Sequence, residues 1–149
     1  MKLNLGCGRD LLPDHVNIDR AEIPCDLRCD FRFPLPFVNG SFASIYSSGV
    51  LEQIGPNEQF VKLMNELHRV LVAEGILTVI VPDAHFPIAF RDPFDCRHFI
   101  PETWDYLDSR DRLWISYGNH YGFLPWNVLY RSVNHNGVMT VGLRKVSAC

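Results

Sequence analysis

The chain has 149 residues, 47% of them hydrophobic and 21% charged, with a formal net charge of -3 at pH 7. These values are ordinary for a globular protein with a full hydrophobic core, and they predict a single domain over residues 1–149. The acidic balance gives no indication of nucleic-acid binding, and no apolar run reaches the ~20 residues of a membrane span.

The first expected strand, Lys2–Leu5, ends in the turn Gly6-Cys7-Gly8. A second short strand, Val16–Asp19, ends on a carboxylate. In an open α/β sheet, glycines after the first strand let the backbone approach a nucleoside, and an acid after the second accepts from its ribose hydroxyls. Pro13 leaves room for only one helical turn between the two strands, which predicts an abbreviated first crossover.

The middle of the chain contains the clearest helix. After a strand over Phe42–Tyr46, the helix is expected to begin at Pro56, and Glu74-Gly75 is expected to end it. Its apolar residues have the spacing of one helix face. They are Phe60, Leu63, Met64, Leu67 and Leu71. The β-branched run Ile76–Val81 then predicts a buried parallel strand.

The last third begins with an irregular, aromatic-rich segment in which Pro101-Glu102-Thr103 is expected to start a helix. Asn136-Gly137 is a strong turn signal between two alternating runs, Trp126–Val133 and Val138–Lys145, and it predicts an antiparallel hairpin. The chain therefore reads as an α/β protein.

The five cysteines are an odd number at irregular spacing, which favours reduced thiols and a cytoplasmic protein. The sequence also carries no secretory leader before its first strand. Cys25 and Cys29 could form half of a metal site, but no second Cys or His pair stands at a matching spacing, so no metal is expected. The cysteines are Cys7, Cys25, Cys29, Cys96 and Cys149.

Several segments in order resemble the motifs of class I S-adenosylmethionine-dependent methyltransferases, over nearly the whole chain. Residues 3–8 match the first glycine motif, and 16–19 resemble the segment that ends on the ribose-binding acid. Asp30 with residues 34–37 is similar to the segment whose acid approaches the adenine. Residues 47–53 stand at the turn that lines the cofactor, and 66–83 resemble the helix-then-strand signature. Residues 92–102 resemble a loop and helix start found in one branch of the family.

The resemblance implies a Rossmann-like, mostly parallel sheet with a C-terminal antiparallel hairpin and helices on both faces. It also implies S-adenosylmethionine as the methyl donor, S-adenosylhomocysteine as the product, and an acceptor that the sequence does not identify. The cofactor-binding residues that it implies are Gly6, Cys7, Gly8, Asp19, Asp30, Ser47, Ser48 and Gly49.

Methyl transfer from a sulfonium needs position and a water-poor pocket rather than a nucleophile or a metal. If the acceptor is a hydroxyl or an amine, the candidates for a general base are Asp83, His85 and His98, which are expected beyond the carboxyl ends of the strands.

Departures from the family pattern leave other functions open. Asp10 stands at the place of a third glycine, Gly49 and Gln53 stand where relatives often carry histidines, and the chain starts directly on its first strand. One alternative is therefore a non-catalytic binding or regulatory subunit. The missing N-terminal cover also predicts that a second copy or a partner subunit covers the site.

A nicotinamide-dependent oxidoreductase is a further alternative. It is disfavoured because Asp19 follows Gly8 by only 11 residues, whereas the dinucleotide-binding unit places its acid ~20 residues on.

Overall fold

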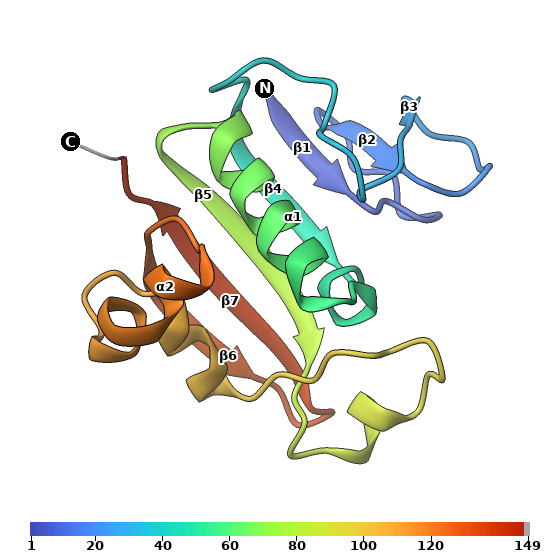
Figure 1. Ribbon diagram of the computed structural model, residues 1–149. Helices are drawn as coiled ribbons and strands as arrows, with labels where there is room; N and C mark the ends of the chain where they lie inside the picture. Colours follow the sequence, from blue (N-terminus) through green and yellow to red (C-terminus); the bar gives the residue numbers. More distant parts are fainter. Residues whose placement is uncertain (148–149) are drawn as a thin grey trace.

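The computed structural model describes residues 1–147, and its centre is a mixed seven-stranded sheet (Figure 1). The strands are β1 (Lys2–Leu5), β2 (Val16–Asp19), β3 (Leu27–Arg28), β4 (Phe42–Ser48), β5 (Leu71–Pro82), β6 (Trp126–Val133) and β7 (Val138–Lys145). Their order across the sheet is β3-β2-β1-β4-β5-β7-β6. The first five run parallel, while β7 pairs antiparallel with both β5 and β6. The mostly parallel sheet and its C-terminal antiparallel hairpin are therefore confirmed.

Helical structure is concentrated in α1 (Asn57–Val70), which connects β4 to β5. The remaining helical segments are one or two turns long. They are η1 (Leu51–Gln53), η2 (Pro87–Phe90), η3 (Pro101–Tyr106), η4 (Trp114–Gly118) and α2 (Asn119–Tyr121). The helix expected to start at Pro101 is thus the short 3-10 segment η3.

The apolar face of α1 is buried against the sheet, as its spacing predicts. The helix is shorter than expected, because Leu71 already has an extended backbone and pairs with Phe42 of β4. Its N–H still bonds to Leu67, so it caps the helix while it starts β5. The C-terminal end of α1 is therefore set by the pairing of Leu71 with β4. The spacing of apolar residues along the helix does not predict this pairing.

The helical segments gather on one face of the sheet rather than on both. In Figure 1, α1 and α2 lie in front of the strands. Phe60 of α1 packs against Phe99, and the Phe99 ring stacks on Trp104 of η3, so α1 and η3 lie on the same side. The connections over residues 6–15 and 20–26 are too short to place a helix on the other face.

The segment over residues 6–15 covers the opposite face of β1 and β2 instead. Asn4 and Asn17 are neighbours in the two strands, and both are buried. Asn4 Nδ2 donates to Asn17 Oδ1 at 2.9 Å and to the Asp10 carbonyl at 2.9 Å. Asn17 accepts from Leu12 N and donates to the Leu12 and His15 carbonyls. Polar side chains of the sheet thus satisfy the backbone of the abbreviated crossover.

Among residues 1–147, no helix has the length and apolar character needed to cross a bilayer.

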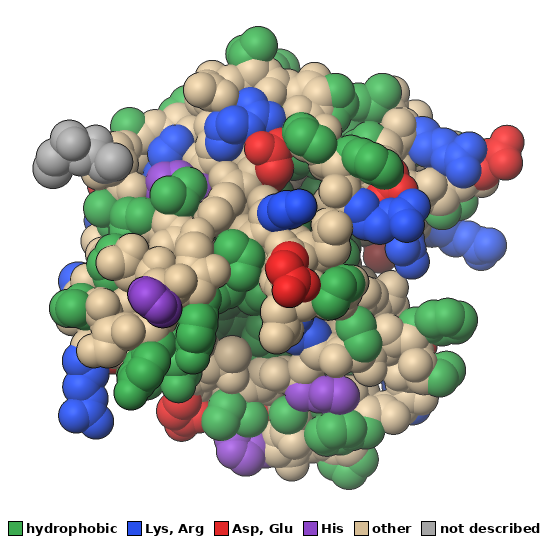
Figure 2. Space-filling model, viewed as in Figure 1, with side chains coloured by type: hydrophobic (Ala, Val, Ile, Leu, Met, Phe, Trp, Pro, Cys, Tyr) green, Lys and Arg blue, Asp and Glu red, His purple; other side chains and the backbone are tan. Residues whose placement is uncertain are grey.

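Figure 2 shows Lys and Arg side chains gathered near β2 and β3, with Asp and Glu side chains among them.

Candidate functional site

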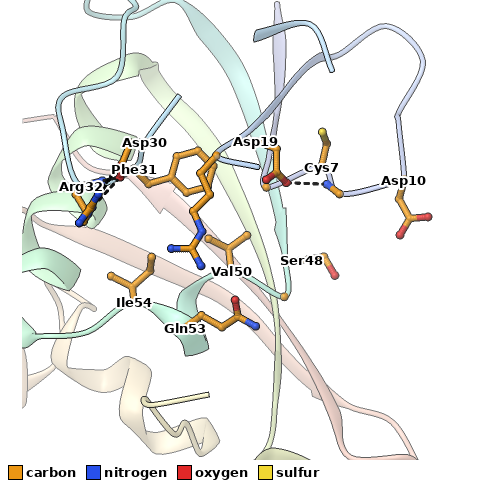
Figure 3. Close-up of a pocket in the computed structure, with 14 residues that line it drawn as sticks. Cys7, Asp10, Asp19, Asp30, Phe31, Arg32, Ser48, Val50, Gln53 and Ile54 are labelled. Carbon is orange, nitrogen blue, oxygen red and sulfur yellow. Dashed lines mark hydrogen bonds and ion pairs between the residues drawn. The ribbon is translucent and has the colours of Figure 1, made fainter. Parts of the chain in front are cut away.

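A cavity of about 310 Å³ opens at the carboxyl ends of β1, β2 and β4 (Figure 3). From β1 the chain moves to β2 on one side, whereas β4 joins β1 on the other, so the strand order reverses here. Open α/β sheets bind their ligands at such a reversal. The cavity is lined by Gly6, Cys7, Gly8, Asp10, Asp19, Arg20, Asp30, Phe31, Arg32, Ser48, Gly49, Val50, Gln53 and Ile54.

Asp19 holds the glycine turn in place. Its Oδ2 accepts from Gly8 N at 2.9 Å, and its Oδ1 accepts from Ala21 N at 2.8 Å. Each carboxylate oxygen keeps a further lone pair that a hydroxyl group can donate to. Between the two glycines, burial raises the pKa of the Cys7 thiol, and Asp19 adds to the rise, so this thiol is not an activated nucleophile.

Asp30 lies on the same cavity but already has a partner. Arg32 donates to both of its carboxylate oxygens, with an Nη2 to Oδ2 distance of 2.6 Å. These bonds hold the pKa of Asp30 at about 2. Phe31 stands between Asp30 and Arg32 in the sequence, and its side chain is almost fully buried. Asp30 therefore brings a fixed carboxylate to one wall of the cavity.

The end of β4 and η1 form the facing wall. Figure 3 shows Val50, Gln53 and Ile54 across the cavity from Phe31. Val50 and Ile54 supply apolar surface, and Ser48 and Gly49 line the cavity at the strand end. Ser47 does not line it: its side chain points into the interior, and its Oγ has no hydrogen-bond partner within residues 1–147.

The structure therefore brings together seven of the eight residues that the sequence predicts to bind the cofactor, all except Ser47. It adds an aromatic and two aliphatic side chains, the guanidinium groups of Arg20 and Arg32, and the side chains of Asp10 and Gln53. Phe31 and Arg32 directly follow Asp30, so the sequence contained a local signal for them. Val50 and Gln53 fall within residues 47–53, which the motif resemblance already assigns to the turn that lines the cofactor. Ile54 lies outside that segment, and only the fold shows which of these side chains face the loop after β3.

The candidate bases lie beyond the end of β5, which pairs with β4. His85 Nδ1 is 2.8 Å from Asp83 Oδ1, and Asp83 is buried while His85 is exposed. His98 stacks on Phe90 with ring centroids 4.3 Å apart. Asp83 and His85 thus form a pair, whereas His98 stands apart from it. None of the three lines the cavity.

The residues of the cavity fit an adenosine group. Asp19 offers acceptors for a diol, and Phe31, Val50 and Ile54 offer apolar walls of the kind that a base requires. A Cβ on Gly6 would run into Val50 Cγ2, so only glycine keeps the cavity open at this point. No group of three or more His, Cys, Asp or Glu side chains among residues 1–147 is arranged to hold a metal ion.

No protein-family model matches the chain, and no curated protein matches it in sequence. Solved structures do match. A methyltransferase from Archaeoglobus fulgidus that depends on S-adenosylmethionine is 12% identical, with a TM-score of 0.68 over 97% of this chain and 85% of that one. The 1,6-didemethyltoxoflavin-N1-methyltransferase of Burkholderia thailandensis, solved with S-adenosylhomocysteine, is 14% identical, with a TM-score of 0.65 over 98% and 71%.

The 4+2 cyclase SpnF is similar to the same degree, at 15% identity and a TM-score of 0.63 over 99% of this chain and 75% of that one. The chain thus has the Rossmann-like fold of class I S-adenosylmethionine-dependent methyltransferases. At these identities the likeness establishes the fold alone. The matching structures include a cyclase as well as methyltransferases. The reaction has to be argued from the site.

Proposed function

We propose that the protein is an S-adenosylmethionine-dependent methyltransferase. The observation that carries the proposal is the position of Asp19, which joins the glycine turn at the point where the strand order reverses. Several structural neighbours are methyltransferases, and one of them was solved with S-adenosylhomocysteine. These observations support the donor and the type of reaction, while the methyl acceptor stays unassigned.

When bound, S-adenosylmethionine supplies a methyl group that is activated by the positive sulfonium sulfur. The sulfur becomes a neutral thioether when the methyl group is transferred. In the proposal, Asp19 accepts from the ribose diol, and Gly6 and Gly8 let the backbone approach the ligand. The side chains of Phe31, Val50 and Ile54 exclude water around the adenine. The chain's contribution is then to orient the donor and to keep its surroundings dry.

An acceptor that loses a proton needs a base, and the Asp83–His85 pair is our candidate. With its Nδ1–H donated to Asp83 Oδ1, His85 keeps a lone pair on Nε2 to accept that proton. Asp83 would act as a positioning residue for the ring. The pair follows β5, which neighbours the β4 end of the cavity. His98 is the weaker candidate because its ring is stacked on Phe90.

A non-catalytic binding subunit receives less support than the enzyme. It would use the same cavity, but it would give no reason for a histidine fixed by a buried carboxylate at the neighbouring strand end. A cytoplasmic location and a second chain over the site remain proposals as well.

The first test is calorimetric titration with S-adenosylmethionine and S-adenosylhomocysteine. We expect both to bind, and Asp19→Ala to weaken both at least ~30-fold, because two hydrogen bonds to a carboxylate are lost. Glu22→Ala, which removes an exposed carboxylate from the same loop, is the matched control and keeps the wild-type affinity. Absence of heat with either nucleoside in the wild type would refute the proposal, and equal affinity in Asp19→Ala would refute the role of Asp19.

A further inference from the structure

Glu52 is a buried acid with no assigned role. It lies in η1 between two residues that line the cavity, Val50 and Gln53, and only 5% of its surface is exposed. Its Oε2 has no hydrogen-bond partner among residues 1–147. A buried carboxyl oxygen without a partner is costly, and such groups concentrate at functional sites.

The carboxyl group of Glu52 lies against the cavity wall. A Cβ built on Gly49 would be 3.5 Å from Glu52 Oε1, and Gly49 lines the cavity at the end of β4. Because Gly49 has no side chain, only its backbone stands beside this carboxyl group. Glu52 is therefore close enough for its charge to act on a ligand in that part of the cavity.

Holding the neighbouring loop does not require the Glu52 side chain. The segment after η2 is fixed by the N–H groups of Cys96 and Arg97, which donate to the backbone oxygen of Glu52 at 2.9 and 3.0 Å. The guanidinium of Arg97 turns away, to Ile54 O and Asn57 Oδ1. The peptide group at position 52 thus makes these contacts, and the carboxyl group is free for another role.

The charged groups around Glu52 are of one sign. Asp95 and Asp92 approach it from the segment after η2, and Gln53 Nε2 lies 3.5 and 3.4 Å from their carboxylates. Burial, with a smaller contribution from these two aspartates, raises the pKa of Glu52 to about 7. Asp83 and His85, on the neighbouring strand end, are paired with each other. This part of the wall therefore favours a positive charge.

We infer that Glu52 is a specificity-determining residue that favours the positively charged methyl donor over its neutral product. The inference rests on the proposed function. S-adenosylmethionine carries a sulfonium where S-adenosylhomocysteine carries a neutral thioether, and their other charged groups are the same. If the ribose binds Asp19 on β2, the rest of the ligand would extend across β1 toward the end of β4, where Glu52 lies behind Gly49. Preference for the donor would limit inhibition by the product.

Calorimetry with both nucleosides at pH 6 and pH 8 tests the inference. In the wild type, the ratio of donor affinity to product affinity is expected to rise with pH, because Glu52 gains its charge over this range. In Glu52→Gln the ratio at pH 8 should fall about tenfold, with product affinity little changed. Glu58→Gln, which changes an exposed acid in the first turn of α1, is the matched control and keeps the wild-type ratio.

Proton release on ligand binding provides a second readout. Near pH 7 about half of the Glu52 side chains are protonated, so donor binding should release up to about half a proton more than product binding. Titration in two buffers of different ionisation enthalpy measures this difference. Glu52→Gln removes Glu52's share and leaves only what the ligands themselves contribute.

The outcomes are distinct. If neither nucleoside binds the wild type, the proposed function fails. If both bind, but proton release is the same for the two ligands or Glu52→Gln leaves the ratio unchanged, the inference about Glu52 fails alone. An equal loss of affinity for both ligands in Glu52→Gln would place Glu52 near a group that they share, such as the ammonium, and would overturn the preference for the sulfonium.

Discussion

Gly6 and Gly8 have left-handed backbones, with φ angles of +69° and +51°, but their surroundings differ. A Cβ on Gly6 would run into the Val50 side chain, whereas a Cβ on Gly8 would meet nothing within 4 Å. Gly6 is therefore required both by its backbone conformation and by the cavity wall. Gly8 is required by conformation alone.

Gly6→Ala should destabilise the protein by about 2–3 kcal/mol, since it adds a clash to a strained backbone. It should also weaken nucleoside binding, because Val50 has to move. Gly8→Ala should cost only about 1 kcal/mol. Urea unfolding and calorimetry measure the two effects, and equal losses in the two variants would contradict the role given to Val50.

Asp30 depends on Arg32 for its low pKa. In Arg32→Gln the pKa of Asp30 should rise from about 2 toward the ordinary value of 3.8, because the charged donor is lost. The pair stabilises the fold above pH 3.8, and this contribution is lost as the pH falls toward 2. Its contribution is small, since 69% of the Arg32 side chain is exposed. A carbon-13 titration of the Asp30 carboxyl group measures the pKa, and an unchanged value would contradict the pairing.

At the scale of elements, the connection between β1 and β2 replaces a crossover helix with a polar network. Asn17 has its side chain bonded to Asn4, Leu12 and His15, and its backbone N–H bonds to Asp26. The network fixes the same segment that carries Gly8 and Asp10 into the cavity.

Asn17→Leu should destabilise the protein by about 2–4 kcal/mol, because it leaves buried polar groups without partners. Amide exchange at Leu12 should accelerate, and nucleoside affinity should fall as the segment loosens. His15→Ala is the control, because it removes only a local side-chain bond to Pro13. Wild-type exchange at Leu12 in Asn17→Leu would show that the segment does not depend on the network.

α1 fixes the other approach to the cavity. Arg69 donates to the carbonyl groups of Leu35 and Phe37, and Glu66 accepts from Leu35 N at 2.7 Å. The proline-rich segment before β4 therefore has an ordered backbone without being a helix or a strand. It follows Asp30–Arg32 in the chain, so a residue on the outer side of α1 helps to hold the wall of the cavity.

At the scale of the whole molecule, ligand binding and folding are coupled, because the cavity is built from three strand ends and two loops. A nucleoside at 100 times its Kd should stabilise the fold by about 2.7 kcal/mol. For a chain of this length, that corresponds to a rise in Tm of roughly 5–10 °C. Differential scanning calorimetry measures the shift, and Asp19→Ala, with its affinity lowered at least ~30-fold, should show no more than about a third of it at the same ligand concentration. A full shift in that variant would place the ligand elsewhere.

The sequence by itself determined the elements whose signals are local. Gly-x-Gly after β1, the carboxylate after β2, the apolar face of α1 and the Asn136-Gly137 turn each depend on neighbouring residues. These local signals were sufficient to predict the parallel sheet, its C-terminal hairpin and the position of the cavity.

Only the tertiary structure decided what long-range contacts control. The placing of the helical segments on one face, the transfer of Leu71 from helix to strand and the withdrawal of Ser47 from the cavity follow from packing between distant segments. The motif resemblance had placed residues 47–53 at the cofactor, but only the tertiary structure showed that Val50, Gln53 and Ile54 face Phe31. The pKa of Glu52 was also decided by the tertiary structure. It is raised by burial and by residues 40 or more positions away in the sequence, and not by the neighbours Leu51 and Gln53.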